Sequence, residues 1–152
     1  MSGEDRPPRP PPGTRDEYLE FIHVGTRWGD NDVYGHVNNV VYYAWFDSAV
    51  NRLLIGRGGL DIVRGEIIGL CVESGCRYHA PVTYPEDVEV GIVVGKLGNT
   101  SVRYELGVFL PGVRPAVAEG FFVHVFVNRG TRRPSAIPGP IASVLRGLLR
   151  VT

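Results

Sequence analysis

The segment from Asn39 to about Leu54 has the pattern of one long helix, and it restricts the fold more than any other feature. Apolar side chains recur along it at i, i+3, i+4 and i+7 spacing: Tyr42, Trp45, Phe46, Ala49 and Leu53. Further apolar residues leave only a narrow polar edge, at Asp47, Ser48, Asn51 and Arg52. A helix that is apolar on most sides has to be enclosed by the rest of its domain. The remaining chain must therefore wrap around this helix.

Most of the remaining chain has the pattern of β-strands. We expect one strand before the helix, at 21–27, and four after it, at about 67–78, 88–97, 101–110 and 116–128. The connections Gly98-Asn99 and Pro111-Gly112 favour antiparallel hairpins. A short amphipathic helix is expected at 138–150. One buried helix followed by long antiparallel strands predicts an α+β fold with the sheet wrapped around the helix.

A sheet of this kind has at least one unpaired edge, which proteins often cover by pairing with a second copy of the chain. The length of 152 residues indicates one domain, and we place it at residues 18–152. Residues 1–17 contain a run of prolines and are expected to form a disordered arm. An arm of this composition is also typical of SH3 ligands.

Charge and cysteine usage exclude several functions. The chain carries 16 basic and 16 acidic residues, which gives no electrostatic footprint for nucleic acid or an anionic membrane. No apolar stretch has the length of a membrane span, and the N-terminus does not resemble a signal peptide. Cys71 and Cys76 lie five apart in one strand, so we expect them on opposite faces and unbonded. No zinc spacing is present, and we predict a reduced, cytoplasmic protein without a metal.

The loop before the long helix contains the residues that are candidates for catalysis. Asp30 and Asp32 are two positions apart, and Gly35 allows the chain to turn after them. Asn38 and Asn39 are both good N-cap residues. A helix N-terminus offers unpaired backbone N–H groups and partial positive charge, which suit a carbonyl oxygen that becomes an oxyanion. A nearby carboxylate is suited to attack that carbonyl or to activate water. Each residue alone is also ordinary turn or cap chemistry, including the loop histidine His36.

The string Asp30-Asn31-Asp32-Val33-Tyr34-Gly35-His36-Val37-Asn38-Asn39 resembles the 4-hydroxybenzoyl-CoA thioesterase family. The resemblance covers about residues 18–138 and implies a hot-dog fold, with an antiparallel five- to six-stranded sheet around a central helix. It implies hydrolysis of acyl-CoA, with Asp32 as the catalytic carboxylate and the backbone N–H of Asn39 as the oxyanion site. It requires no cofactor, because CoA is part of the substrate. A homodimer or homotetramer is implied as well.

The same string resembles the acyl carrier protein thioesterases of plants, in which an asparagine and a histidine are catalytic. The histidine matches His36, but the asparagine position is Tyr34 here. This departure favours Asp32 as the chemical group and acyl-CoA as the substrate. His36 then positions other groups, while Asp30, Gly35 and Asn38 support the loop.

In related sequences the hairpin between the third and fourth strands meets the CoA. Here Lys96 and Arg103 are suited to pair with phosphates, and Asn99 and Thr100 to hydrogen-bond them. An ordinary polar hairpin is an equally good interpretation. Arg77, His79 and Tyr84 are weaker candidates for the same role. Two other functions stay open: an acyl-thioester dehydratase or hydratase, and a non-catalytic acyl-thioester-binding protein.

Overall fold

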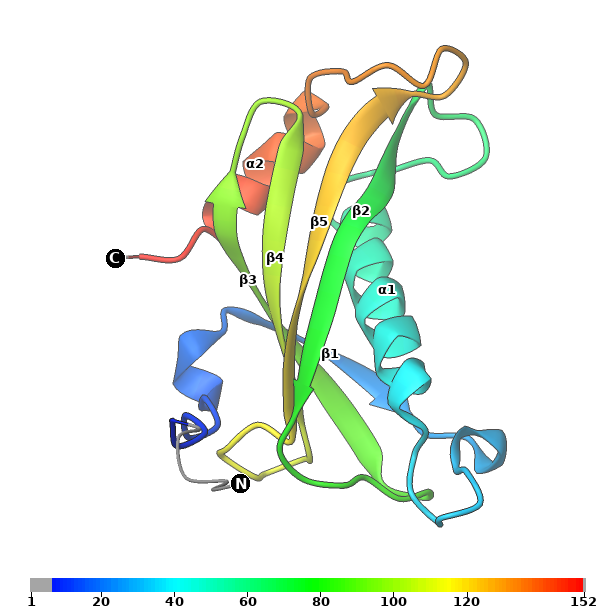
Figure 1. Ribbon diagram of the computed structural model, residues 1–152. Helices are drawn as coiled ribbons and strands as arrows, with labels where there is room; N and C mark the ends of the chain where they lie inside the picture. Colours follow the sequence, from blue (N-terminus) through cyan, green and yellow to red (C-terminus); the bar gives the residue numbers. More distant parts are fainter. Residues whose placement is uncertain (1–6, 152) are drawn as a thin grey trace, which may run out of the picture.

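A five-stranded antiparallel sheet curves around one side of a long helix in the computed structural model, which describes residues 7–151 (Figure 1). The elements of the sheet are β1 (Glu20–Gly25), β2 (Ile67–Tyr78), β3 (Asp87–Leu97), β4 (Ser101–Phe109) and β5 (Ala118–Asn128). They lie in the order β1-β3-β4-β5-β2, and each neighbouring pair is antiparallel. Each strand expected from the sequence is present, and the α+β fold is confirmed.

The helix α1 (Asn39–Gly56) forms the centre of the core. All five residues of its apolar stripe are buried, and Phe46 and Ala49 have no exposed surface at all. They pack on the inner face of the sheet, where the largest buried side chains include Ile92, Tyr104 and Leu106. The periodicity therefore gave both the helix and its buried side correctly.

The second helix, α2 (Gly139–Gly147), is shorter than the 138–150 expected. Its buried residues Ile141 and Leu145 belong to the main core. The chain leaves the helix there because it pairs with β3: Val94 donates to the Leu148 carbonyl oxygen and accepts from the Arg150 N–H, both at 2.8 Å. Neither helix of the described residues is long and apolar enough to cross a membrane.

The two cysteines of β2 differ from the sequence-based expectation. A β-bulge between Cys71 and Glu73 shifts the register of β2, so that Cys71 lies opposite His124 and Cys76 opposite Gly120. Both cysteines therefore face α1, and the expectation of opposite faces was wrong because the bulge adds one residue to the alternation. Both thiols are free.

The N-terminal segment lies on the outer face of the sheet. The Gly13 N–H donates to the Glu119 carboxylate at 3.1 Å, and Tyr18 is buried in a small second core with Val93 and Phe109. Contacts between the N-terminal segment and the sheet thus begin at Gly13, before the domain boundary that we expected at residue 18. Residues 1–6 of the expected arm lie outside the described residues, and the division into arm and domain stays a prediction.

Candidate active site

The loop between β1 and α1 is held by its own hydrogen bonds. The Asp30 side chain is only 1% exposed and accepts from the Arg27 backbone N–H at 2.7 Å and from the Arg27 guanidinium at 3.0 and 3.1 Å. The Asp30 carbonyl oxygen accepts the N–H of Asn38 at 2.9 Å. Asp30 thereby ties the beginning of the loop to the beginning of α1.

Asp32 sits in a tight turn within this loop. Its backbone N–H donates to the His36 carbonyl oxygen at 2.9 Å, and its Oδ1 accepts the Tyr34 N–H at 2.9 Å. Gly35 has φ +81°, a left-handed conformation that glycine adopts without steric cost. Asp32 is half-buried, and its Oδ2 has no hydrogen-bond partner within residues 7–151. One carboxylate oxygen thus shapes the turn while the other is available.

The first turn of α1 leaves one amide without a partner. Asn38 is the N-cap: its Oδ1 accepts the Val40 N–H at 3.1 Å, and its carbonyl oxygen accepts the Val41 N–H at 3.0 Å. The Asn39 N–H donates to no group among the described residues. Because helix N-termini carry partial positive charge, this amide is suited to bind an oxygen that gains negative charge.

Asn39 lines a cleft of about 290 Å³. Its walls come from the loop, the helix start and the end of β2, and they include His36, Val37, Asn39, Tyr42, Tyr78 and His79. The Tyr78 hydroxyl donates to the Asn39 carbonyl oxygen at 3.0 Å, and its ring lies edge-on to Tyr42 at 5.0 Å. Burial raises the pKa of Tyr42 to about 12 and also raises the pKa of Tyr78, so both hydroxyls stay protonated near neutral pH.

Of the site residues that we predicted, the structure brings Asn39 and His36 together in this cleft. Asp32 belongs to the same loop but is not among the residues that line the cleft. Tyr78 was missed by the sequence reasoning, and His79 was named only for a different role. The available signal was their position at the end of a predicted strand, just before a turn.

The predicted CoA-binding hairpin joins β3 and β4 at the opposite end of the sheet from the Asp32 loop (Figure 1). Lys96 is exposed there. The Arg103 guanidinium donates to Glu105 at 2.7 Å and lies over the Phe121 ring at 3.9 Å. Within one chain, the structure does not bring this hairpin and the loop together.

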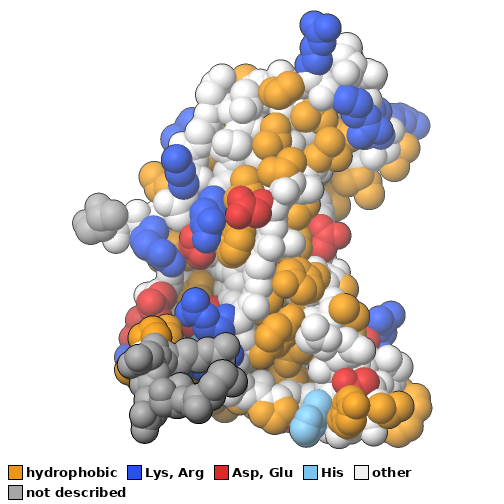
Figure 2. Space-filling view, viewed as in Figure 1, with side chains coloured by type: hydrophobic (Ala, Val, Ile, Leu, Met, Phe, Trp, Pro, Cys, Tyr) orange, Lys and Arg blue, Asp and Glu red, His pale blue; other side chains and the backbone are white. Residues whose placement is uncertain are grey.

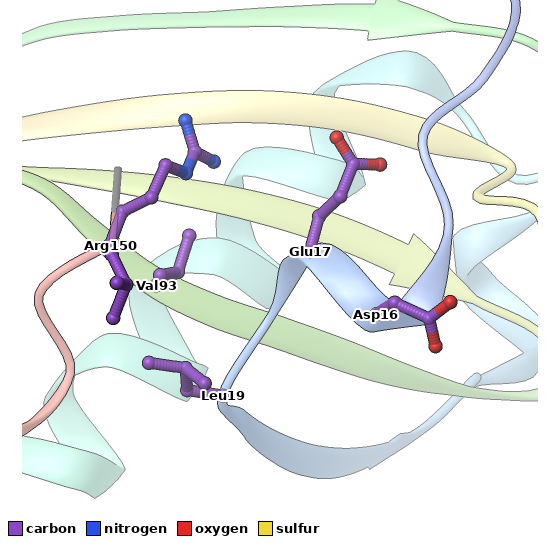
Figure 3. A pocket seen from close by; sticks show the side chains of 6 residues that line it. Asp16, Glu17, Leu19, Val93 and Arg150 are labelled. Atoms are coloured by element: carbon purple, nitrogen blue, oxygen red, sulfur yellow. The ribbon is translucent and has the colours of Figure 1, made fainter.

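A larger hollow of about 370 Å³ lies on the outer face of the sheet. Figure 3 shows the acidic side chains of Asp16 and Glu17 on one side of it and Arg150 on the other, with Val93 and Leu19 below Arg150 in the view. None of the predicted site residues lines this hollow.

Comparison with known proteins gives the family. Residues 26–145 match the model of the thioesterase-like superfamily, and the chain belongs to this superfamily. The hot-dog thioesterase family expected from the loop motif is confirmed, and the membership supports thioester hydrolysis as the general activity. No curated protein matches the chain.

Among solved structures, the PA5185 protein from Pseudomonas aeruginosa is 56% identical, with a TM-score of 0.91 over 92% of this chain and 98% of that one. The gentisyl-coenzyme A thioesterase BH1999 is 23% identical, with a TM-score of 0.73 over 83% and 99% of the two chains. The 1,4-dihydroxy-2-naphthoyl-CoA thioesterase Slr0204 from Synechocystis is 15% identical, with a TM-score of 0.75 over 84% and 96%. The last two similarities show the fold alone.

Proposed function

We propose that the chain hydrolyses acyl-CoA thioesters to the free acid and coenzyme A. The observation that carries the proposal is that the Asn39 N–H has no partner among the described residues, at a residue that lines the cleft beside the Asp32 loop. The thioester carbonyl oxygen accepts a hydrogen bond from this amide, which stabilises the negative charge that develops during acyl transfer.

Asp32 acts on the thioester in one of two ways. As a nucleophile, its carboxylate attacks the carbonyl carbon and releases CoA thiolate, and water then cleaves the resulting anhydride. As a general base, it takes a proton from the attacking water, and the thiolate leaves in the next step. Both routes consume one water and yield one acid and one thiol. Neither route uses a metal or a redox cofactor.

Two observations favour acyl-CoA as the substrate. Two proteins of the same fold are named as CoA thioesterases. In addition, Lys96 is exposed on the β3–β4 hairpin, with Asn99 and Thr100 beside it as hydrogen-bonding groups. We assign the CoA phosphates to this hairpin, with Arg103 as a further contact. Because the hairpin lies far from the loop of its own chain, a second copy has to supply it.

The edge strand β2 supplies a surface for that second copy. It is twelve residues long, pairs only with β5, and exposes Cys71, Val72, Glu73 and Ser74 in its middle. On the face shown in Figure 2, hydrophobic side chains follow the region of β2 and β5, with charged side chains on both sides of them. Pairing of two β2 edges gives a homodimer, on which a homotetramer can be built. The free thiols of Cys71 and Cys76 fit a reducing, cytoplasmic location.

Release of free thiol from a panel of acyl-CoA compounds tests the proposed function. The panel includes aromatic and aliphatic acyl groups, and the same acyl groups on a carrier protein. We expect thiol release from at least one acyl-CoA. Hydration of an enoyl-CoA without thiol release identifies a hydratase, and tight binding without turnover identifies a non-catalytic binder. Either of these results overturns the proposal.

A further inference from the structure

We infer that Tyr78 is a positioning residue for the Asn39 amide, and that the hydrogen bond between Glu119 and His79 on the outer side of the sheet holds Tyr78 in place. This inference rests on the proposed function. It concerns three residues for which the loop motif gives no role.

Tyr78 acts on the peptide unit that directly follows the unpartnered amide. The hydroxyl of Tyr78 donates to the Asn39 carbonyl oxygen at 3.0 Å, while the Val40 N–H of the same peptide unit donates to Asn38 at 3.1 Å. Both ends of this peptide unit are therefore held by side chains, at a position where helices otherwise fray. The Asn39 N–H belongs to the preceding peptide unit, whose Asn38 carbonyl oxygen accepts the Val41 N–H, and the two units meet at the Cα of Asn39. The Tyr78 ring is in turn supported by its edge-on contact with buried Tyr42.

His79 forms part of the wall of the cleft, but its side chain is directed to the outer face of the sheet. Successive residues of an extended chain point to opposite sides, and Tyr78 points toward α1. The Nε2 atom of His79 lies 2.7 Å from Oε2 of Glu119 on β5, and the His79 side chain is only 6% exposed. Beyond the last pair of the β2–β5 ladder, the backbone N–H groups of His79 and Ala80 both donate to the Val117 carbonyl oxygen. The hydrogen bond between His79 and Glu119 is the side-chain anchor for this end of β2.

Glu119 is itself fixed from a third direction. Its Oε1 accepts the Gly13 N–H at 3.1 Å, and the Gly13 carbonyl oxygen accepts the Ala116 N–H at 2.9 Å. The N-terminal segment thus lies over the His79–Glu119 contact on the outer face. A chain of contacts runs from Gly13 through Glu119, His79 and Tyr78 to Asn39.

Steady-state kinetics of Tyr78→Phe test the inference. This variant keeps the ring and its contact with Tyr42 and loses only the hydroxyl. We expect kcat for acyl-CoA hydrolysis to fall about tenfold while KM changes less than about twofold, because a misplaced amide affects the transition state more than the bound substrate. Tyr104→Phe is the matched control: it also removes a hydroxyl, which contacts His124 in the core at 3.3 Å, and we expect its kcat to stay near wild type.

The double variant tests the link across the sheet. Glu119→Ala should lower kcat about threefold alone and should add nothing in the Tyr78→Phe background, whereas independent sites would give additive effects. Additive effects, or a wild-type kcat in Tyr78→Phe, overturn the inference. If Tyr78→Phe does not fold, the kcat and KM of Glu119→Ala decide by the same criterion. If the wild type releases no thiol, the proposed function fails first; if it is active and only Asp32→Asn is impaired, the inference on Tyr78 alone fails.

Discussion

Asp30 and Asp32 are the same residue type two positions apart, yet their surroundings differ. The Asp30 carboxylate is buried, and the N–H groups of Arg27 occupy both of its oxygens. The Asp32 carboxylate is half-buried, with one oxygen in the turn and the other without a partner in residues 7–151. A carboxylate with satisfied hydrogen bonds stabilises a loop, whereas one with an available oxygen is able to act on a substrate. These environments support the different roles proposed for the two residues.

At the same scale, His124 makes the stability depend on pH. It is 2% exposed on β5, and burial lowers its pKa below the ordinary 6.5, although the charge of Asp47 acts in the opposite direction. The unfolded chain therefore binds a proton below about pH 6.5 that the folded chain does not bind, so the free energy of unfolding falls as pH drops through this range. Denaturant unfolding at pH 7.5 and 5.5 measures the difference. In His124→Gln we expect a smaller difference, and an unchanged one would contradict this prediction.

At the scale of elements, regular periodicity predicted most of the fold. The stripe on α1 and the positions of the strands depend on local patterns, and both were predicted correctly from the sequence. The bulge in β2 and the early end of α2 depend on pairing with distant residues, His124 and Val94, which no local pattern reveals. Tyr78 escaped detection for the same reason, because its partner Asn39 is remote in the sequence. The loop motif itself was informative because its residues contact each other within one short segment.

The N-cap of α1 gives a prediction for this element. Asn38→Ala removes the side-chain oxygen that accepts the Val40 N–H, and we expect it to lower the free energy of unfolding by about 1 kcal/mol. Asn51→Ala is the control: Asn51 lies inside the same helix and bonds only to Asp47, and alanine has the best helix propensity there. Urea denaturation compares the two. Equal losses in both variants would show that the cap has no special role.

The β3–β4 hairpin gives a second prediction for an element. Lys96 is the only lysine of the chain. If Lys96 pairs with a CoA phosphate, we expect Lys96→Ala to raise KM for acyl-CoA about threefold to tenfold with little change in kcat. Added salt should reduce the difference in KM between the variant and the wild type, because it screens the ion pair. Arg52→Ala, which removes an exposed cation from α1, serves as the control. If KM stays at the wild-type value in Lys96→Ala, the assignment of Lys96 to the CoA site is contradicted.

At the scale of the whole molecule, we propose that the edge of β2 forms the interface between two copies of the chain. Val72 is 60% exposed in the middle of this edge, and lysine at such a position opposes pairing with another strand. We expect Val72→Lys to sediment as a monomer and to lose hydrolysis. Val63→Lys, at a valine outside the sheet that is 76% exposed, should keep the wild-type assembly and hydrolysis. Sedimentation velocity gives the molecular mass. A wild type that is monomeric at micromolar concentration contradicts the assembly that we propose.

The most direct test of the proposed chemistry is thiol release by the wild type, Asp32→Asn and Asp61→Asn on the best acyl-CoA of the panel. Asp61 is a matched control, because its carboxylate also accepts backbone N–H groups in an exposed loop turn. We predict that Asp32→Asn lowers kcat by about a hundredfold or more, while Asp61→Asn keeps the wild-type rate. Wild-type turnover in Asp32→Asn would contradict the assignment of the catalytic carboxylate.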